Sequence, residues 1–464
     1  MKRKEEDVME KIISLCKRRG FIFQGSEIYG GLAGTWDYGP YGVALRNTIK
    51  HLWWKRFVDD RNDIFGVDAA ILMNQNVWKA SGHVGGFSDP LVEDLKTKKR
   101  FRADHLLEEQ GIDPKGMTLA QMDALIKEKK LKSPDGNALG EVRQFNMMFK
   151  THVGAIQDDT SISYLRPETA QGMFVNFKNI IDTFHPKLPF GLAQIGKAFR
   201  NEIAPRDFIF RLREMEQMEV EYFVDPRDEK SIMAEFDKLF DEQMNFLADL
   251  GLTKSKIHKV EIAPADRAHY SKRSVDTEFD FPFGQKELGG LAYRTDYDLK
   301  AHTEKSGVDL SYFDEETKTR FIPHCIEPTF GVDRLTLAIL ADAYREDELG
   351  GEKREYLKLS PKVAPILVAV FPLLKNKPIL VEKAKEVYSE LKKVFGARVT
   401  FDDNGNIGKR YRRQDEIGTP YCVTVDFDTV EKEAGVTVRN RDTGEQERMP
   451  ISDLASYLLG KISS

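Results

Sequence analysis

The sequence predicts an α+β fold, with a large domain built on an antiparallel sheet and a smaller α/β domain after it. Between residues 163 and 343, long segments of strand character are interrupted by helical ones, as in antiparallel sheets covered by helices. Beyond residue 361, short apolar strands alternate with helices. The length of 464 residues fits two or more domains, because a single hydrophobic core rarely grows that large.

The N-terminal part predicts two helices separated by a glycine-rich turn. Residues 5–19 place aliphatic side chains on one helical face, and Gly20 follows as a stop. A stretch rich in glycine and aromatic residues, 30–42, leads into a long helix predicted over residues 43–60. Residues 63–74 then have the composition of a strand.

Residues 92–150 differ in composition and are predicted to be an insertion in the large domain. They begin with a highly charged segment and continue as a short helix and a loop of solvated character. The lysines of this segment could contact RNA, but such a run of charge is more often a solvated surface.

The middle of the chain carries the strands of the predicted sheet. Polar and apolar residues alternate over residues 215–224, which predicts a strand whose carboxylates all face water on one side. Two helical stretches are expected around residues 229–250, and further strands within residues 259–299. A strand followed by an apolar helix closes the block over residues 321–344, so the large domain is predicted to span residues 1–355.

The C-terminal domain is predicted over residues 361–464. This part of the chain has 17 lysines and arginines against 15 aspartates and glutamates, a formal net charge of +2. The rest of the chain has a formal net charge of −7. The asymmetry is modest, but it has the sign that an RNA-binding module needs.

Composition excludes several classes of protein. The net charge of −5 argues against a basic protein that coats nucleic acid, so any nucleic-acid contact must be local. Cys16, Cys325 and Cys422 are far apart and fit neither a disulfide framework nor a metal pair, which suits a reducing compartment. The N-terminus lacks the apolar region of a signal peptide, and no stretch reaches the length of a membrane span. We therefore expect a cytoplasmic protein with no membrane partner.

Two arginine-containing segments are candidate phosphate sites. Arg200 and Glu202 in AFRNE have the spacing of two side chains on one side of a strand. An arginine there can neutralise a phosphate while the glutamate accepts a hydrogen bond from a base amine. Arg334 opens an apolar helix after EPTFGVD, and helix starts favour phosphate. Taken alone, each segment is better explained as surface, with an ion pair in the first and an Asp333 helix cap in the second.

Acidic residues recur on the apolar strands and predict a cationic ligand. Carboxylates buried near one another are unfavourable unless a cation lies between them, such as the ammonium of an amino acid or Mg²⁺ with ATP. The set is Glu168, Glu216, Glu219, Glu287 and Glu327. The sequence has no P-loop, GxGxxG, HExxH or GxSxG motif, which excludes the corresponding chemistries.

In combination, these segments resemble the class II aminoacyl-tRNA synthetases, and the glycyl-tRNA synthetase family in particular. FRNE followed by RLRE resembles motif 2, GVDR resembles motif 3, and WDYGPYGVALRNTIKHLWWKRFV resembles the motif 1 region. NVWKASGHVGGFSDP, RFRADHL, YLRPETAQGMF and YRTDYDLKAH resemble the glycine enzyme in order and spacing. The segment from Pro361 is similar to the anticodon-binding domain of the glycine, histidine, proline and threonine enzymes. The ordered combination spans nearly the whole chain and is far more specific than any single motif.

The resemblance implies where the substrates bind. Arg200 would hold the α-phosphate of ATP, Arg334 the γ-phosphate, and Glu202 would read the adenine amine. The implied ATP-binding residues are Arg200, Asn201, Glu202, Phe210, Arg211, Leu212, Arg213, Glu214, Met215, Glu287, Leu288, Gly331, Val332, Asp333 and Arg334. The implied substrate-binding residues are Arg102, Glu168, Met215, Glu216, Gln217, Met218, Glu219, Arg294, Glu327, Pro328, Thr329, Phe330 and Gly331.

The glycine pocket of the family is built from carboxylates that accept the ammonium and leave no room for a side chain. Glu168, Glu219 and Glu327 match these carboxylates, and Arg294 is the expected partner of the glycine carboxylate. The expected catalytic set is Arg200, Arg334 and Glu168.

Three departures from the family pattern affect the expected site. Met215 replaces an aromatic residue that would stack on adenine, so we expect altered rather than lost stacking. Thr329 replaces a frequent serine, keeps the hydroxyl and adds a methyl group. Many relatives have paired cysteines before RADH, whereas this chain has none, so we expect no metal site there.

The implied activity is that of a ligase. ATP, with Mg²⁺, would activate glycine to glycyl-adenylate, and the glycyl group would pass to the 3′ end of its tRNA. The motif 1 aromatics would otherwise form an exposed apolar surface, which together with the family pattern implies a homodimer.

Three alternatives are less consistent with these residues. A non-catalytic relative, such as the accessory subunit of a mitochondrial DNA polymerase, has no reason to keep ATP ligands. Another class II synthetase would not be expected to share the glycine-like RPETAQG and EPTFG segments. A scaffold with a merely acidic surface would not bury its glutamates.

Overall fold

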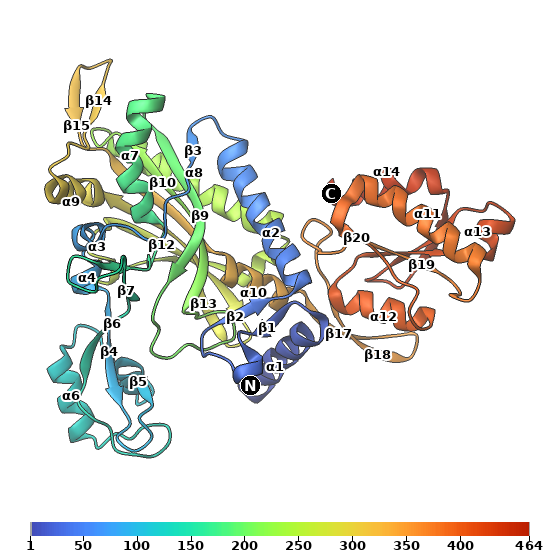
Figure 1. Cartoon of the computed structure of the whole chain (residues 1–464), viewed down its shortest axis with the longest axis horizontal. Coiled ribbons are helices and arrows are strands. Elements are labelled where there is room, and N and C mark those ends of the chain that lie inside the picture. Colours follow the sequence, from blue (N-terminus) through green and yellow to red (C-terminus); the bar gives the residue numbers. More distant parts are fainter. Residues whose placement is uncertain (1, 464) are drawn as a thin grey trace.

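A seven-stranded sheet forms the centre of the structure, a computed structural model that describes residues 2–463 (Figure 1). Its strand order is β11-β12-β13-β16-β10-β9-β3, and within it only the pair β3 and β9 is parallel. The strands are β3 (Ile64–Gly66), β9 (Phe190–Phe199), β10 (Glu214–Val224), β11 (Ile257–Glu261), β12 (Arg273–Phe281), β13 (Gly284–Thr295) and β16 (His324–Gly331). The predicted α+β class with an antiparallel sheet is confirmed.

Helices pack against both faces of this sheet. The set α2, α8 and α10 covers one face, with α1 beside them, and α7 and α9 cover part of the other face. The helices are α1 (Lys2–Arg19), α2 (Pro40–Trp54), α7 (Ala170–Phe184), α8 (Glu229–Asp249), α9 (Tyr297–Ser306) and α10 (Val332–Ala343). The part of the second face that α7 and α9 leave open carries the candidate site.

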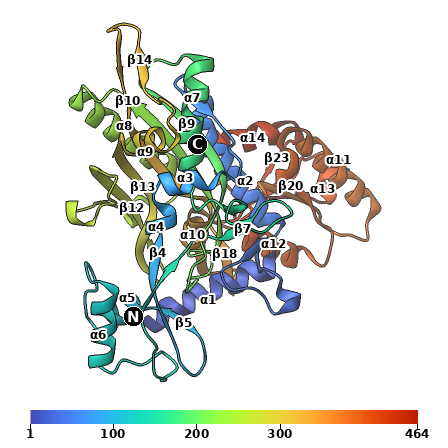
Figure 2. The same cartoon turned by 60° about the vertical axis from the view of Figure 1, so that its left-hand side comes forward.

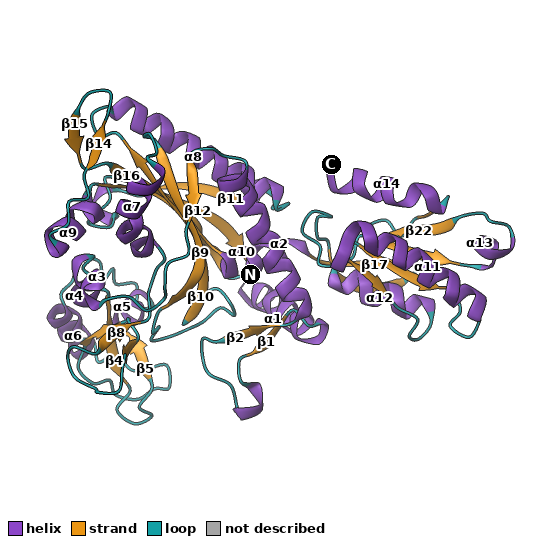
Figure 3. Cartoon of the chain, turned by 45° about the horizontal axis from the view of Figure 1, so that its top comes forward, coloured by secondary structure: helices purple, strands orange, loops and turns teal. Residues whose placement is uncertain are grey.

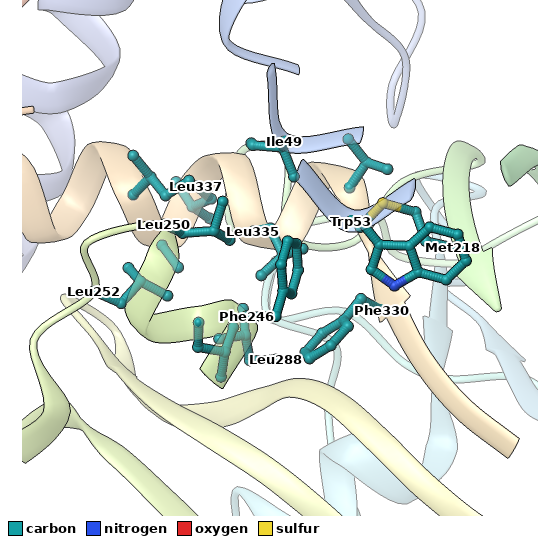
Figure 4. Close-up of a cluster of buried hydrophobic side chains, with 14 of the residues drawn as sticks. Ile49, Trp53, Met218, Phe246, Leu250, Leu252, Leu288, Phe330, Leu335 and Leu337 are labelled. Carbon is teal, nitrogen blue, oxygen red and sulfur yellow. The ribbon is translucent and has the colours of Figure 1, made fainter. Parts of the chain in front are cut away.

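The main hydrophobic core lies between the sheet and helices α2, α8 and α10 (Figure 4). Trp53 of α2 and Met218 of β10 are buried in it, and the rings of Phe246 and Phe330 lie 5.5 Å apart between their centroids. Because side chains alternate along a strand, burial of Met218 on this face directs its neighbours to the opposite face.

Shorter elements surround the sheet. Two hairpins outside this sheet are β1–β2 near the N-terminus and β17–β18 after α10. The remaining short elements of the large domain are β1 (Ile22–Gln24), β2 (Trp36–Tyr38), α3 (Gln75–Ala80), α4 (His83–Gly86), β7 (Lys150–His152), β8 (Ile162–Tyr164), β14 (Tyr312–Asp314), β15 (Thr319–Phe321), β17 (Tyr344–Leu349) and β18 (Glu352–Leu357).

Some expectations about these elements are wrong. Residues 229–250 form the single helix α8 instead of two stretches, because one apolar face continues through Phe236, Leu239 and Phe246. Residues 63–74 contribute only three strand residues, since the chain leaves the edge of the sheet after Gly66. The side of β10 that was expected to face water is buried from Gln217 onward.

The expected exposure of the motif 1 aromatics is also wrong. Trp53 is buried in the core, and Trp54 packs so closely on Gly66 that a Cβ there would lie 2.5 Å from the indole. The exposed apolar side chains of this region are instead at the tip of the β1–β2 hairpin, where Ile28 is 89% and Tyr29 is 87% exposed.

Residues 88–146 form a small lobe beside the main sheet, at the lower left of Figure 1. It consists of β4 (Ser88–Glu93), β5 (Arg100–Arg102), α5 (Ala103–Glu108), α6 (Leu119–Glu128) and β6 (Arg143–Asn146). Val92, Leu107 and Ile126 give it a core of its own, so its solvated character is confined to the outer surface. The Asp94 carboxylate accepts hydrogen bonds from the Ser133 hydroxyl, a side-chain amide and two backbone amides, and so joins two of its loops.

The C-terminal part folds around a five-stranded sheet of order β20-β19-β21-β22-β23, which stands apart from the first sheet in Figures 2 and 3. β19 is parallel to β20 and β21, whereas β22 is antiparallel to β21 and β23. Its elements are β19 (Val368–Pro372), α11 (Pro378–Phe395), β20 (Val399–Phe401), α12 (Ile407–Ile417), β21 (Tyr421–Val425), α13 (Phe427–Glu431), β22 (Val436–Asn440), β23 (Gln446–Met449) and α14 (Ile451–Ser463). The predicted alternation of strands and helices is confirmed.

A buried arginine joins the β17–β18 hairpin to the C-terminal part. Arg354 of β18 donates to Asp347 within its own hairpin at 2.6 and 2.9 Å, and to Asp415 of α12 at 2.9 Å. It also donates to the backbone oxygen of Arg441 at 2.8 Å. The β17–β18 hairpin therefore ties α10 to the C-terminal sheet.

Within residues 2–463, every helix is too short or too polar to span a membrane. Cys16, Cys325 and Cys422 are buried free thiols.

Candidate active site

A cavity of about 650 Å³ lies on the sheet face opposite α2, α8 and α10. Alternation along β10 directs Met215, Gln217 and Glu219 into it, and alternation along β16 does the same for Glu327 and Thr329. Strands β12 and β13 line it as well, and the loops that follow β9 and β11 supply further walls.

Most of the sequence-predicted residues line this cavity, although they come from segments far apart in the chain. Those that line it are Arg102, Glu168, Arg200, Glu202, Phe210, Arg211, Leu212, Met215, Gln217, Glu219, Glu287, Leu288, Arg294, Glu327, Thr329, Gly331, Asp333 and Arg334.

The other predicted residues have side chains elsewhere. They are Asn201, Arg213, Glu214, Glu216, Met218, Pro328, Phe330 and Val332. Met218, Phe330 and Val332 belong to the main core, because alternation turns the first two to the far face of the sheet. Arg213 donates to the backbone oxygens of Glu202 and Ala33, so it fixes the wall of the cavity.

Asp333 and Glu216 connect the site to the elements behind it. Asp333 does not cap α10, whose N-cap is Gly331; its carboxylate accepts from the Tyr38 hydroxyl at 2.5 Å and from the backbone of Glu216 at 2.8 Å. Glu216 pairs with Arg46 of α2 at 2.9 Å. These contacts fix the start of α10 and therefore the residue that follows, Arg334.

Arginines gather at one end of the cavity. Arg334 Nη1 lies 3.0 Å from Glu287 Oε2, and its guanidinium lies 4.5 Å from the ring centroid of Phe210. The positive charge of Arg334 lowers the pKa of Glu287. Burial lowers the pKa of Arg211, which lies near Glu202. This cationic end suits a polyanion such as a triphosphate.

Arg200 and Glu202 lie just after β9, so the expectation that they share a strand is wrong. The chain leaves the sheet after Phe199, yet both side chains line the cavity. Arg200 Nε donates to the backbone oxygen of Pro167 at 3.1 Å. Glu202 Oε2 is buried without a hydrogen-bond partner among the described residues, and Arg211 Nη1 lies 3.6 Å away. A buried acceptor in that state is suited to an amine donor.

Carboxylates gather at the other end. Glu219 Oε2 accepts from the Thr169 backbone at 3.1 Å and from the Thr169 hydroxyl, and Glu219 Oε1 accepts from Gln217 Nε2 at 2.9 Å. Burial, together with the nearby Glu327 and Glu168, raises the pKa of Glu219 to about 8. A cation bound among these groups would lower that pKa again.

Arg294 holds Glu327 in this acidic end. Its Nη1 donates to both oxygens of Glu327 at 2.9 and 3.0 Å, and its other two nitrogens donate to Asp298 at 2.8 and 2.9 Å. The ring of Tyr270 lies 4.1 Å from the guanidinium. Burial raises the pKa of Glu327 despite this pairing. Because every guanidinium nitrogen already has a carboxylate partner, the arrangement favours a positioning role for Arg294.

Glu168 has a low pKa although it is mostly buried. Burial alone would raise its pKa, but the charge and hydrogen bond of His83 hold the pKa well below the usual range. His83 Nε2 lies 3.3 Å from Glu168 Oε2, and Gln171 Nε2 donates to Glu168 Oε1 at 3.0 Å.

Sequence reasoning missed two carboxyl groups, Asp276 in the cavity lining and Glu221 near Glu327. Glu221 is fully buried, accepts from Cys325 Sγ at 2.9 Å, and burial with the nearby Glu327 raises its pKa well above the usual range. It lies two residues beyond Glu219 on the same side of β10, so the alternation could have identified it. Burial and the nearby Glu287 raise the pKa of Asp276 to about 7, and no motif marks this residue in the sequence.

The fold and the two-ended cavity define a class of protein, and comparisons with family models agree. Residues 149–343 match the model described as tRNA synthetase class II core domain (G, H, P, S and T), and residues 367–461 match the model described as anticodon binding domain.

Curated glycine–tRNA ligases are similar over the whole chain. The protein of Caldanaerobacter subterraneus subsp. tengcongensis is 52% identical over 462 residues, covering 98% of each chain. That of Geobacillus kaustophilus is 52% identical over 464 residues, covering 98% of this chain and 99% of its own. That of Clostridium acetobutylicum is 51% identical over 469 residues, covering 99% and 100%. The chain belongs to the glycine–tRNA ligase family.

Proposed function

We propose that this protein uses ATP to activate glycine and transfers the glycyl group to tRNA. The observation that carries the proposal is the division of one cavity into an arginine-rich end and a carboxylate-rich end, with Arg334 and Glu327 on consecutive elements of the fold. A triphosphate and an ammonium group are complementary to these two ends.

At the arginine end, Arg200 is assigned to the α-phosphate of ATP and Arg334 to the γ-phosphate. The Glu202 oxygen that has no hydrogen-bond partner among the described residues accepts from the adenine amine, and Met215 packs against the base. Mg²⁺ takes oxygen ligands and binds through the phosphates with few protein groups. Glu287 is the carboxylate at this end that is suited to it, and the ion would supply neutralisation of phosphate charge.

At the carboxylate end, Glu168, Glu219 and Glu327 receive the glycine ammonium. Thr329 lines the same end, and its hydroxyl lies 3.5 Å from Glu219 Oε1. Its methyl group narrows the space beside the α-carbon, so rejection of alanine is steric. Arg294 keeps Glu327 in place; a direct contact with the glycine carboxylate would require one of its ion pairs to open.

The reaction requires no covalent intermediate on the protein. The glycine carboxylate attacks the α-phosphorus and displaces pyrophosphate, and a ribose hydroxyl of the terminal tRNA adenosine then takes the glycyl group. The side chains of Arg200 and Arg334 act by holding the phosphates and neutralising charge that develops on them.

We assign residues 1–355 to the catalytic domain and residues 361–464 to anticodon recognition. The match of residues 367–461 to the anticodon binding domain model supports the second assignment. Residues 92–150, which supply Arg102 to the cavity, are assigned to an insertion in the catalytic domain.

The assembly is proposed to be a homodimer in the cytoplasm. The exposed Ile28 and Tyr29 on the β1–β2 hairpin support dimerisation, since an apolar tip of this kind is usually covered. The buried free thiols agree with a reducing compartment. Light scattering on the purified chain tests the dimer, and replacing Ile28 and Tyr29 together by serine should yield monomers if the tip is the contact.

The test of the activity is exchange of labelled pyrophosphate into ATP, run with each of the twenty amino acids. Exchange with glycine alone is the expected result. Folded protein with Mg²⁺ that supports exchange with no amino acid would contradict the proposal.

A further inference from the structure

One segment without a role in the reaction contacts both ends of the cavity. Residues 81–87 connect α3 to β4 and include α4. At one point of this segment the His83 ring meets Glu168, and at its end the ring centroid of Phe87 lies 5.5 Å from the Arg200 guanidinium. The segment therefore lies against the proposed ammonium site and the proposed phosphate site at once.

The imidazole of His83 has a polar partner on each nitrogen. Nε2 lies 3.3 Å from Glu168 Oε2, and Nδ1 lies 2.8 Å from Ser81 Oγ. Both contacts can be satisfied at once, with Nε2–H donating to the carboxylate and a hydrogen bond between Nδ1 and the hydroxyl. The rings of Trp78 and Phe87 enclose the imidazole, with centroids 5.6 and 5.4 Å away.

The backbone of the segment is fastened on its other side. Asn146 Nδ2 donates to the carbonyl oxygen of Val84 at 2.9 Å, and the Met147 amide donates to that of Phe87 at 3.0 Å. Gly82 has φ +81°, a conformation that favours glycine. The ring is thus presented to Glu168 from a defined backbone.

The two oxygens of Glu168 are consequently oriented from opposite sides. Gln171 Nε2 donates to Oε1 at 3.0 Å, and His83 lies against Oε2. A carboxylate fixed in this way needs no reorientation when an ammonium arrives, which is how positioning contacts strengthen binding. A ring that served packing alone would not need a polar partner on each nitrogen.

We propose that His83 is a positioning residue for glycine, which holds Glu168 in the orientation that receives the ammonium. The inference rests on the proposed function of the carboxylate end. It predicts that His83 affects the KM for glycine and leaves the KM for ATP nearly unchanged, although both substrates bind in the same cavity.

Two substitutions separate the hydrogen bond from the packing. His83→Phe keeps an aromatic ring between Trp78 and Phe87 but removes the donor, whereas His83→Gln keeps an amide donor at a similar reach and removes the ring. In glycine-dependent pyrophosphate exchange, His83→Phe should raise the KM for glycine about tenfold or more, the ratio expected for a lost hydrogen bond to a charged group. His83→Gln should raise it less than about threefold, and the KM for ATP should change less than about twofold in both.

The melting temperature of each variant separates a folding defect from loss of the contact. If His83→Phe does not fold, His83→Ala supplies the comparison with His83→Gln. If the wild type catalyses glycine-dependent exchange and the variant without the donor has the wild-type KM for glycine, the inference is wrong. The proposed function would be unaffected by that result. Equal rises in the KM values for glycine and ATP would also overturn the inference, because they indicate a general collapse of the site. Absence of glycine-dependent exchange in the wild type would instead contradict the proposed function, and the inference with it.

Discussion

Arg294 and Glu327 are joined by a single guanidinium nitrogen, which lies 2.9 and 3.0 Å from the two carboxylate oxygens. The opposite edge of the same guanidinium binds Asp298, so one buried cation lies between two carboxylates. This triad contributes to the charge at the carboxylate end of the cavity. It leaves Glu168 and Glu219 as the carboxylates there that Arg294 does not bind directly.

Replacing Arg294 by glutamine should destabilise the protein and weaken glycine binding. Removing one member of a buried ion pair costs about 3–5 kcal/mol, because the remaining charge has no partner. Urea unfolding measures the first effect and the KM for glycine in pyrophosphate exchange measures the second. Asp298→Asn is the matched control, since it weakens the triad without removing the partner of Glu327. A folded Arg294→Gln variant with an unchanged KM for glycine would show that Glu327 does not need this arginine.

Glycine binding should release a proton below about pH 8. Burial and the neighbouring Glu327 and Glu168 raise the pKa of Glu219 from 4.5 to about 8, so the free protein holds a proton there at neutral pH. An ammonium favours the ionised carboxylate, and affinity for glycine should therefore rise with pH up to about 8. Titration calorimetry in two buffers of different ionisation enthalpy measures the released proton, which Glu219→Gln should abolish. Identical heats in the two buffers for the wild type would contradict this prediction.

The same pKa has the opposite consequence for the unliganded protein. A carboxyl whose pKa is raised on folding favours the folded state below its unfolded pKa of 4.5, and this contribution is lost as pH rises through about 8. The free energy of unfolding without glycine should thus fall between about pH 5 and pH 8, and the fall should be smaller in Glu219→Gln.

Loss of Arg334 should affect the chemical step. Arg334→Ala should lower kcat of pyrophosphate exchange by about a hundredfold or more, as for other groups that stabilise transition-state charge. Arg334→Lys is the comparison, because it keeps a cation beside Glu287, which lies 3.0 Å from the Arg334 guanidinium. Its kcat should fall less than that of Arg334→Ala. Comparable kcat values in Arg334→Ala and wild type would remove this arginine from the mechanism.

The Arg354 contact between the β17–β18 hairpin and α12 should matter for tRNA charging but not for adenylate formation. Arg354 bonds Asp347 of its own hairpin and Asp415 of α12, far from the cavity residues in the chain. Arg354→Met should reduce the rate of tRNA charging by about tenfold or more, because the bound tRNA must be oriented from both parts of the protein. Pyrophosphate exchange without tRNA should stay near the wild-type rate. Parallel losses in the two assays would point to misfolding instead.

The α+β fold class and the identity of most cavity residues follow from local patterns in the sequence. Alternation over β10 separates Glu219, in the cavity, from Met218, in the core, and motif resemblance brings distant segments such as those of Arg200 and Arg334 together. The alternation of polar and apolar residues along a strand could not predict which side of that strand is exposed to solvent. The carboxylate side of β10 was expected to be wet, yet it is covered by elements whose packing depends on tertiary structure.

Three of the residues that were missed share one cause, which does not apply to Glu221. Asp276, Tyr270 and His83 reach the site from segments whose proximity arises only when distant strands pair and the loops fold over the sheet. The aromatic residues Trp53 and Trp54 were misplaced for the same reason, because a helix sequence reveals an apolar face but not what covers it.

The most direct measurement is charging of a tRNA transcript with a glycine anticodon, followed as labelled glycine that becomes acid-precipitable. The account predicts an ester of glycine on the tRNA, formed with one AMP released per glycine and not formed with alanine. It also predicts that Arg200→Ala abolishes charging within the limit of detection. Charging with another amino acid, or folded wild-type protein that leaves the tRNA uncharged in the presence of ATP and Mg²⁺, would contradict it.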